Sequence, residues 1–384
     1  MSLVYLVAGE ASGDVLGARL MEALRRRRPD LSFAGIGGAR MEAQGLHSLF
    51  PMRDLAVMGL IEVLPKLRKL SARLDQTVAD IAQKRPDLLV TIDSPGFTLR
   101  VLKRVAPMGI NRAHYVAPQV WAWHESRVRT FPGLWDLLLC LFPFEPEFFA
   151  RHGLPARFVG HPVLMSGADH GDAARFRRRH GIADRAPVLI LMPGSRKSEV
   201  PRLLPVFGET LKLLRRDMPD LVPVVPVSAV VAEAVHRAAK NWEVQPVLVT
   251  ELDDKHDAYA AAGAALTKSG TSTLELALAG VPMAVTYRVN PITGYFARRM
   301  IRVPYVAMVN LLAGRALVPE LLLGDCNPKT LAATVLTLMR DQAATDAQRE
   351  GFAEVIASLR PAEGDPADQA AAALLELLAV SPKT

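Results

Sequence analysis

Short runs of aliphatic residues alternate along the chain with longer segments in which apolar residues recur every three or four positions. The first pattern indicates buried β-strands and the second indicates amphipathic helices. Strands are expected at 3–8, 88–92, 188–192, 222–227, 246–250, 264–267 and 282–287, and helices at 14–27, 97–105, 198–216, 229–240, 272–279, 292–301 and 365–380. This alternation predicts an α/β fold built on doubly wound parallel sheets.

A break in this rhythm predicts a domain boundary. Residues 160–187 are rich in Gly, Pro and His, and a new strand begins after them. We expect an N-terminal Rossmann-like domain at 1–165, a C-terminal Rossmann-like domain at 166–345, and a helical tail at 346–384 that packs on its neighbours. Two such domains facing a cleft would present the carboxyl ends of both sheets, where open α/β sheets bind their ligands.

Composition excludes several classes of protein. Half of the 384 residues are apolar and 22% are charged, which is typical of a globular chain. The only two cysteines, Cys140 and Cys326, cannot build a disulfide framework or a cysteine-rich zinc site, and they favour a reducing compartment. No basic stretch precedes the N-terminal apolar run, so we interpret it as a strand rather than a signal peptide. No apolar run is long enough to predict a membrane-spanning helix.

The charge of the chain favours an anionic partner. Lys and Arg number 46 against 39 Asp and Glu, which gives a formal net charge of +7. A nucleotide, an anionic lipid or a nucleic acid would each fit this charge, but no nucleic-acid-binding motif accompanies it. Residues 58–73 predict a helix with one apolar and one basic side, which suits either a membrane surface or packing against the core.

The turn at 9–14, between the first strand and its helix, combines glycines with polar residues. Its spacing matches neither the G-x-G-x-x-G of a dinucleotide site nor the G-x-S-x-G of a hydrolase nucleophile. In one interpretation Glu10 and Ser12 face the ligand. In the other, Ser12 or Asp14 caps the helix that follows.

A second polar turn follows the strand at 188–192. Ser195 and Arg196 stand between that strand and a helix, where backbone amides and a guanidinium would converge on a phosphate. An exposed arginine on an ordinary turn is the alternative.

A third polar turn follows the strand at 264–267. Ser269, Gly270 and Thr271 form it, and Glu275 lies about one turn into the next helix. Because a carboxylate repels a diphosphate, Glu275 fits neutral hydroxyls such as the pair on a ribose. The second and third turns together predict a nucleoside diphosphate site. Helix caps and a solvated Glu275 are the alternative.

Asp93 directly follows the strand at 88–92, at the edge where side chains of an α/β sheet meet the ligand. It is the candidate general base, and an Asx turn before Pro95 is the alternative. The acidic cluster at 253–257 does not predict a metal site, because it lies in a polar connection and Lys255 opposes cation binding. We expect neither a metal nor another cofactor.

Eight segments, in one order from the first strand to about residue 340, resemble the lipid-A-disaccharide synthases. The segments are AGEASGD (8–14), GIGGARM (35–41), AVMGLIEVL (56–64), YVAPQVWAW (115–123), VGHP (159–162), MPGSRKSEV (192–200), KSGTSTLE (268–275) and NLLAGRALVPELL (310–322). Three positions depart from the pattern of these relatives. Gly96 replaces a second carboxylate, Val309 replaces a proline, and Leu323 replaces a glutamine, so polar contacts at Leu323 are not expected.

The resemblance implies a two-lobed GT-B glycosyltransferase. Such an enzyme joins UDP-2,3-diacylglucosamine to 2,3-diacylglucosamine 1-phosphate, inverts the anomeric carbon, and releases UDP and a β-1,6-linked disaccharide without a metal. It implies a peripheral protein at the cytoplasmic face of the inner membrane and leaves a homodimer open. The matching positions are Asp93 as base, Arg196 with 269–271 at the diphosphate, Glu275 at the ribose, Asn310 near the nucleotide, and Glu10 with Ser12 in the acceptor-side loop.

Two other functions fit the residues. A UDP-sugar 2-epimerase of similar fold needs the same nucleotide site and no lipid acceptor. A non-catalytic protein that binds a nucleotide sugar or a lipid would need no base.

Overall fold

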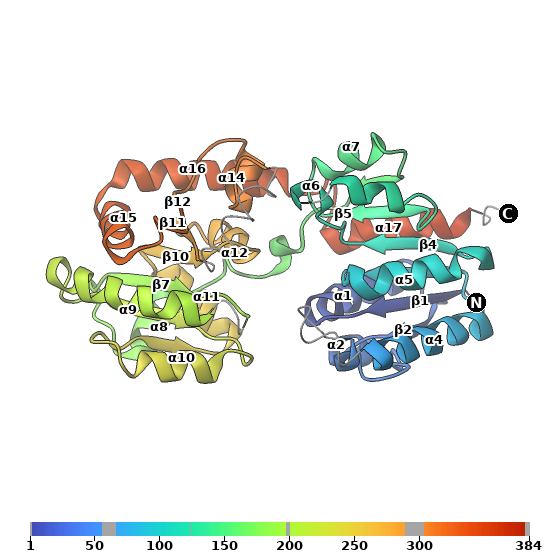
Figure 1. Cartoon of the computed structure of the whole chain (residues 1–384), viewed down its shortest axis with the longest axis horizontal. Coiled ribbons are helices and arrows are strands. Elements are labelled where there is room, and N and C mark those ends of the chain that lie inside the picture. Colours follow the sequence, from blue (N-terminus) through green and yellow to red (C-terminus); the bar gives the residue numbers. More distant parts are fainter. Residues whose placement is uncertain (1, 56–66, 124, 197–199, 289–302, 381–384) are drawn as a thin grey trace. The chain divides into compact units, whose positions relative to one another are not determined.

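The computed structural model describes residues 2–55, 67–123, 125–196, 200–288 and 303–380 (Figure 1). Its contacts divide the chain into two compact units. The first unit comprises Met1–Pro162 with Leu359–Thr384, and the second comprises Val163–Ser358. Each holds one six-stranded sheet whose neighbouring strands all run parallel. The α/β fold and the parallel sheets predicted from the alternation are therefore confirmed.

The sheet of the first unit has the strand order β2-β1-β3-β4-β5-β6. Its strands are β1 (Leu3–Ala8), β2 (Ser32–Ile36), β3 (Leu88–Ile92), β4 (Asn111–Tyr115), β5 (Leu137–Cys140) and β6 (Ala156–Phe158). Its helices are α1 (Ala11–Arg27), α2 (Ala39–Ala43), α4 (Leu67–Lys84), α5 (Pro95–Val105), α6 (Val120–Trp123), α7 (Glu145–Ala150) and α17 (Pro366–Ala379), with 3-10 turns η1 (Met52–Asp54), η3 (Ala106–Met108) and η4 (Glu125–Thr130).

The sheet of the second unit has the order β12-β11-β10-β7-β8-β9. Its strands are β7 (Val188–Met192), β8 (Val222–Pro226), β9 (Val247–Val249), β10 (Ala264–Lys268), β11 (Met283–Tyr287) and β12 (Glu320–Leu322). Its helices are α8 (Ala173–His180), α9 (Val200–Asp217), α10 (Ala232–Ala239), α11 (Leu252–Ala261), α12 (Ser272–Leu278), α14 (Met308–Ala313), α15 (Pro328–Arg340) and α16 (Gln342–Ser358), and the 3-10 turn η5 (Pro162–Met165) leads into the unit.

Each sheet has one point at which the winding of the chain reverses direction. In the first unit β2 and β3 lie on opposite sides of β1, and in the second unit β8 and β10 lie on opposite sides of β7. The strands that flank these points are in register, with Ala8 opposite Ile92 and Met192 opposite Thr267. Open α/β sheets bind ligands beyond the carboxyl ends of the strands at such points.

The C-terminal helix α17, red in Figure 1, returns to the first unit and lies beside α1 and β4. Asp365 caps it by accepting a hydrogen bond from Asp368 N, and Pro366 fills the first helical position, where no N–H is needed. At its other end, the Asn111 amide donates to Leu377 O and Val380 O. These bonds satisfy carbonyls that the end of a helix leaves without partners.

The strands expected at 3–8, 88–92 and 188–192 are confirmed with the same bounds. The other expected strands are also present, with ends that differ by one residue. The helix expected at 292–301 lies outside the described residues.

Candidate functional site

The turns after β1 and β3 pack against each other at the reversal point of the first unit. A Cβ on Gly9 would lie 2.4 Å from the Ser94 Oγ, so only glycine allows this approach. A Cβ on Gly13 would lie at an ordinary van der Waals contact distance from Ile92 O. The chain from Gly9 to Ser12 therefore borders Asp93 and Ser94, with Glu10 partly exposed and Ser12 exposed. The residues predicted to face a ligand in this unit come together at one sheet edge.

Asp93 and Ser94 have left-handed backbones, with φ of +50° and +49°. This conformation is costly for residues other than glycine, and such strain gathers at functional sites. One carboxylate oxygen of Asp93, Oδ1, accepts a hydrogen bond from Ser94 N at 2.7 Å. An ordinary Asx turn would use the N–H two residues on, which Pro95 lacks. No described residue donates to the other oxygen, Oδ2.

Asp14 does not serve as the predicted cap of the helix that follows its turn. It is buried, and its carboxylate accepts hydrogen bonds from the backbone N–H of Gly38, Arg40 and Met41. It therefore caps α2 rather than its own helix, and neither residue proposed as a cap of α1 serves as one. This contact ties the GIGGARM segment to the turn after β1.

At the reversal point of the second unit, the turn after β7 holds Ser195 and Arg196, and both are exposed. Gly194, just before them, has φ of +103°, which favours glycine. Residues 197–199 lie outside the described structure, so the start of the next helix is described only from Val200. The turn after β10 contains Gly270 and Thr271, which are also exposed. Because β7 and β10 are paired, both predicted phosphate-binding turns leave the same sheet edge.

Ser269 joins the turn after β10 to a hydrogen-bonded network around Glu320. The Ser269 hydroxyl donates to Val306 O at 2.8 Å, and Val306 N donates to the Glu320 carboxylate at 3.0 Å. Glu320 also accepts from Ala307 N and from the Asn310 amide. The network holds the chain just before α14 against the turn after β10.

Asn310 is fully buried within this network. Its amide nitrogen donates to Val318 O and to Glu320, and its amide oxygen accepts from Val318 N. Direct contact with a nucleotide would require these bonds to break. The structure therefore favours Asn310 as a residue that shapes the site.

Two residues of α11 contact the carboxylate of Glu275 on α12. Its oxygen Oε2 lies 2.9 Å from Lys255 Nζ and 3.3 Å from the Tyr259 hydroxyl. The same hydroxyl lies 3.6 Å from the sulfur of Met192, the last residue of β7. Burial raises the pKa of Tyr259 well above its usual value, and the neighbouring Glu275 adds to this shift. Tyr259 therefore stays protonated and donates to Glu275.

Sequence reasoning missed Glu320, Lys255 and Tyr259 as members of the site. Glu320 lies in the NLLAGRALVPELL segment, so its place in a matching motif was the available signal. Lys255 and Tyr259 carry no comparable signal, because their partner Glu275 is brought to them only by the folding of α11 against the sheet.

The acidic cluster at 253–257 lies on helix α11, and the expectation of a polar connection there was wrong. Two of its three acids are already paired with basic side chains. Asp254 pairs with Arg179 and His180, and Asp257 accepts two bonds from Arg175. These ion pairs fix α8 to α11, so a metal would have to displace them.

Comparison with known proteins identifies the family. A family model described as lipid-A-disaccharide synthetase matches residues 4–374. The chain is 62% identical to the lipid-A-disaccharide synthase of Gluconobacter oxydans, over 98% of this chain and 91% of that one. It is 59% identical to the lipid-A-disaccharide synthase of Granulibacter bethesdensis, over 98% of each chain.

The chain belongs to the lipid-A-disaccharide synthases. Solved structures show the fold. A UDP-GlcNAc 2-epimerase from Neisseria meningitidis bound to UDP-GlcNAc superposes with a TM-score of 0.65 at 11% identity, covering 98% of this chain and 99% of that one. CalG4, the calicheamicin glycosyltransferase, superposes with a TM-score of 0.62 at 17% identity, covering 99% of each. The fold is GT-B-like, and membership of the synthase family makes the chain a glycosyltransferase.

A cluster of aromatic residues surrounds a buried carboxylate. Trp121 packs edge-on to Phe142 and Phe144, and its indole N–H donates to Glu145. Phe142 also stacks on His161 of the VGHP segment. Burial raises the pKa of Glu145 to about 7, although three N–H groups donate to it. These contacts are those of a packed core cluster.

The membrane expectation centred on residues 58–73, of which 58–66 lie outside the described structure. In the part that is described, Lys69 and Arg73 both pair with Asp54, and Arg73 lies over the ring of Phe50. Leu70 packs against the core. These contacts are those of a helix packed on its own unit. None of the described helices combines the length and apolar character needed to cross a bilayer.

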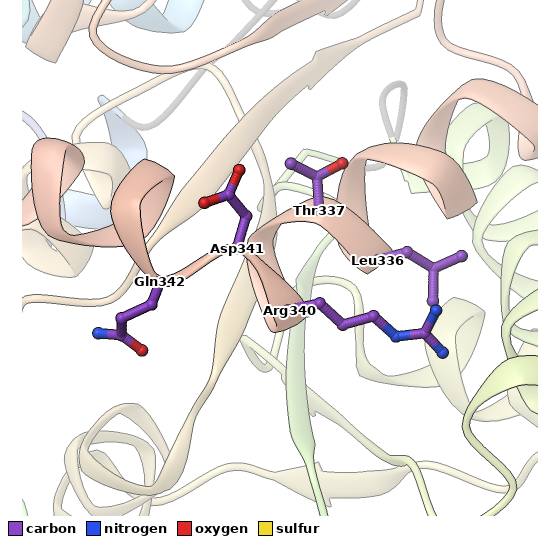
Figure 2. Close-up of a pocket in the computed structure, with 5 residues that line it drawn as sticks. All are labelled: Leu336, Thr337, Arg340, Asp341 and Gln342. Carbon is purple, nitrogen blue, oxygen red and sulfur yellow. The ribbon is translucent and has the colours of Figure 1, made fainter.

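A shallow depression lies at the junction of α15 and α16, where Leu336, Thr337, Arg340, Asp341 and Gln342 line it (Figure 2). Figure 2 shows its side chains diverging from the junction rather than converging on a ligand. Arg340 donates to Asp217 O, and Asp341 accepts from Ala344 N at the start of α16. These groups stabilise the helix ends, and we assign the depression no role in binding.

Proposed function

We propose that this glycosyltransferase joins UDP-2,3-diacylglucosamine to 2,3-diacylglucosamine 1-phosphate in one displacement. Asp93 takes the proton from the acceptor 6-hydroxyl as that oxygen bonds to the anomeric carbon of the donor. The bond from that carbon to the diphosphate breaks on the opposite face and UDP leaves with the electron pair. The anomeric carbon is therefore inverted, and the product is the β-1,6-linked disaccharide.

The position of Asp93 supports its assignment as the base. It stands at the end of β3 beside the turn that carries Glu10 and Ser12, which we assign to the acceptor. Ser94 N holds one carboxylate oxygen at 2.7 Å, and the other is available to the acceptor hydroxyl. A base must come within hydrogen-bond reach of the proton that it removes, so an oriented carboxylate suits this step.

The second unit is assigned to the donor. Arg196, Ser195 and the turn 269–271 take the diphosphate, because an arginine fork and backbone N–H groups compensate the charge that grows as UDP leaves. Glu275 takes the ribose hydroxyls. Asn310 and Glu320 hold the chain that supports Ser269.

One observation carries the proposal. The polar turns chosen from the sequence leave the carboxyl ends of β1 and β3 in one unit and of β7 and β10 in the other, and each pair flanks the reversal point of its sheet. Ligands of open α/β sheets bind at these points.

The test supplies purified protein with the UDP-sugar, with and without the lipid acceptor, and follows the products. We expect disaccharide and UDP only when the acceptor is present. A 2-epimer formed without acceptor would instead support the epimerase, and binding without any product would support the non-catalytic protein. Membership of the synthase family favours the first outcome.

The acylated substrates also place the reaction at a membrane surface, so we propose peripheral association at the cytoplasmic face of the inner membrane. The measurement is co-sedimentation with anionic vesicles at raised salt. Leu64→Asp and Leu67→Asp should release the protein if 58–73 is the anchor. Ala79→Asp, at an exposed position of α4, adds the same charge without removing a leucine. Equal sedimentation of all variants would exclude this segment as the membrane anchor.

Sedimentation equilibrium of the purified protein tests the homodimer separately.

A further inference from the structure

Two donors from one face of α11 converge on a single oxygen of Glu275. Lys255 and Tyr259 stand four residues apart on that helix, the spacing that places side chains on the same face. Their donor atoms, Nζ and the hydroxyl, lie 2.9 and 3.3 Å from Glu275 Oε2. No described residue donates to the other oxygen, Oε1.

The surroundings hold this arrangement in place. Tyr259 is only 1% exposed, and its hydroxyl also contacts the sulfur of Met192. The Lys255 ammonium lies 5.7 Å from the centre of the Tyr259 ring, within the range of a cation–π contact. The side chains of Lys255 and Glu275 remain 20% and 27% exposed, so the group is packed on one side and open on the other.

A carboxylate held in this way has one oxygen committed and one available. A free glutamate rotates and offers either oxygen in many directions, whereas a held glutamate presents Oε1 in a fixed direction. Fixing a binding group beforehand removes the entropy cost of ordering it when the ligand arrives. A ligand that lacks the matching hydroxyl leaves the oriented oxygen without a partner and loses that hydrogen bond.

We propose that Lys255 and Tyr259 are positioning residues that make this site select a ribose over a 2′-deoxyribose. The inference rests on the proposed function, in which Glu275 takes the ribose hydroxyls. Lys255 and Tyr259 act through Glu275 and touch no reacting atom. A hydrogen bond to a charged acceptor sets the expected discrimination between the two sugars at about 10-fold to 100-fold.

The experiment is a calorimetric titration of the full chain with UDP and with 2′-deoxy-UDP. The parent should bind UDP at least about 10-fold more tightly. Lys255→Met and Tyr259→Phe should each lower this ratio by about threefold or more, and Lys255→Arg should keep most of it. Lys240→Met changes an exposed lysine of the same unit and should leave the ratio unchanged.

The ratio of the UDP affinity to the 2′-deoxy-UDP affinity distinguishes a loss of positioning from a general loss of structure. A variant that merely loosens the unit weakens both nucleotides equally and leaves the ratio at the parental value, which would overturn the proposal. A parent that binds both nucleotides equally would also overturn it. The disaccharide assay judges the proposed function independently, because a parent that makes disaccharide without discriminating the sugars retains the function and loses only this inference.

Discussion

The sheets of both units have a reversal point, but the backbone conformations of the turns that flank it differ between the units. In the turns that flank the reversal point of the first sheet, left-handed conformations fall on Asp93 and Ser94, with φ of +50° and +49°. In the turns that flank the reversal point of the second sheet they fall on Gly194 and Gly270, with φ of +103° and +159°. The first unit therefore places side-chain-bearing residues where the second unit uses glycine.

The difference matches the chemistry assigned to each unit. A strained non-glycine residue costs about 1–3 kcal/mol and persists only where its neighbours determine the geometry. In the proposed mechanism, the first unit accepts this cost because it orients the carboxylate that takes the proton. Glycine allows the backbone to approach a ligand closely, so the second unit suits the binding of an anion by N–H groups.

The sharpest test of this comparison is Asp93→Asn. If the strained turn exists to present a base, the variant should keep its fold and lose about 100-fold to 10,000-fold in turnover. The measurement is UDP release at saturating concentrations of both lipid substrates. A rate close to that of the parent would exclude Asp93 as the base.

Arg196→Ala tests the second unit. Removing one group that stabilises the leaving diphosphate should lower turnover by about 100-fold or more. Because the position is exposed, thermal stability should change little. Near-normal turnover in the disaccharide assay would remove Arg196 from the mechanism, and retention by Arg196→Lys would show that charge alone suffices.

Gly9→Ala tests whether close packing holds the strained turn. The new Cβ would lie 2.4 Å from Ser94 Oγ, so the turn must shift. We expect a loss of stability of about 1–3 kcal/mol and a fall in turnover of about 10-fold or more, because small displacements of catalytic groups are costly. Gly96→Ala is the matched control, since a Cβ there meets nothing within 4 Å. Equal stability and equal turnover of the two variants would show that this close packing does not support catalysis.

Several apolar strands, such as β3 and β7, could be predicted from the sequence because runs of aliphatic residues indicate burial. Strand β4 could not, because three of its five residues are Asn111, Arg112 and His114. Their polar groups find partners far along the chain, in α17, Asp136 and Thr91. The pattern of apolar residues along the chain does not indicate such partners.

The same limit applies to the candidate site. Turns after strands have local signatures, so Asp93, Arg196 and the turn 269–271 could be proposed from sequence. The residues that support them act across helices. Asp14 caps a helix that begins 25 positions later at Ala39, and Lys255 reaches Glu275 from a separate helix. Only the folded chain brings these groups together.

The last prediction concerns pH and a buried histidine near the strained strand end. His114 on β4 shares a hydrogen bond of 2.8 Å with Thr91, two residues before Asp93, and its ring stacks on Trp135. No described residue bonds its other ring nitrogen, Nε2. Burial lowers the pKa of His114 from 6.5 to about 4, so the folded state holds it neutral where the unfolded state takes up a proton.

The stability contributed by this neutral ring is present above pH 6.5 and is lost as the pH falls towards 4, by up to about 3 kcal/mol. Glu145 acts in the opposite direction, because burial raises its pKa to about 7 and the folded state holds its proton. Comparing His114→Gln with the parent isolates the histidine, since Glu145 is common to both. As the pH is lowered from 7 to 4, the melting temperature should fall less steeply for the variant than for the parent. Parallel curves would mean that His114 does not link the stability of the first unit to pH.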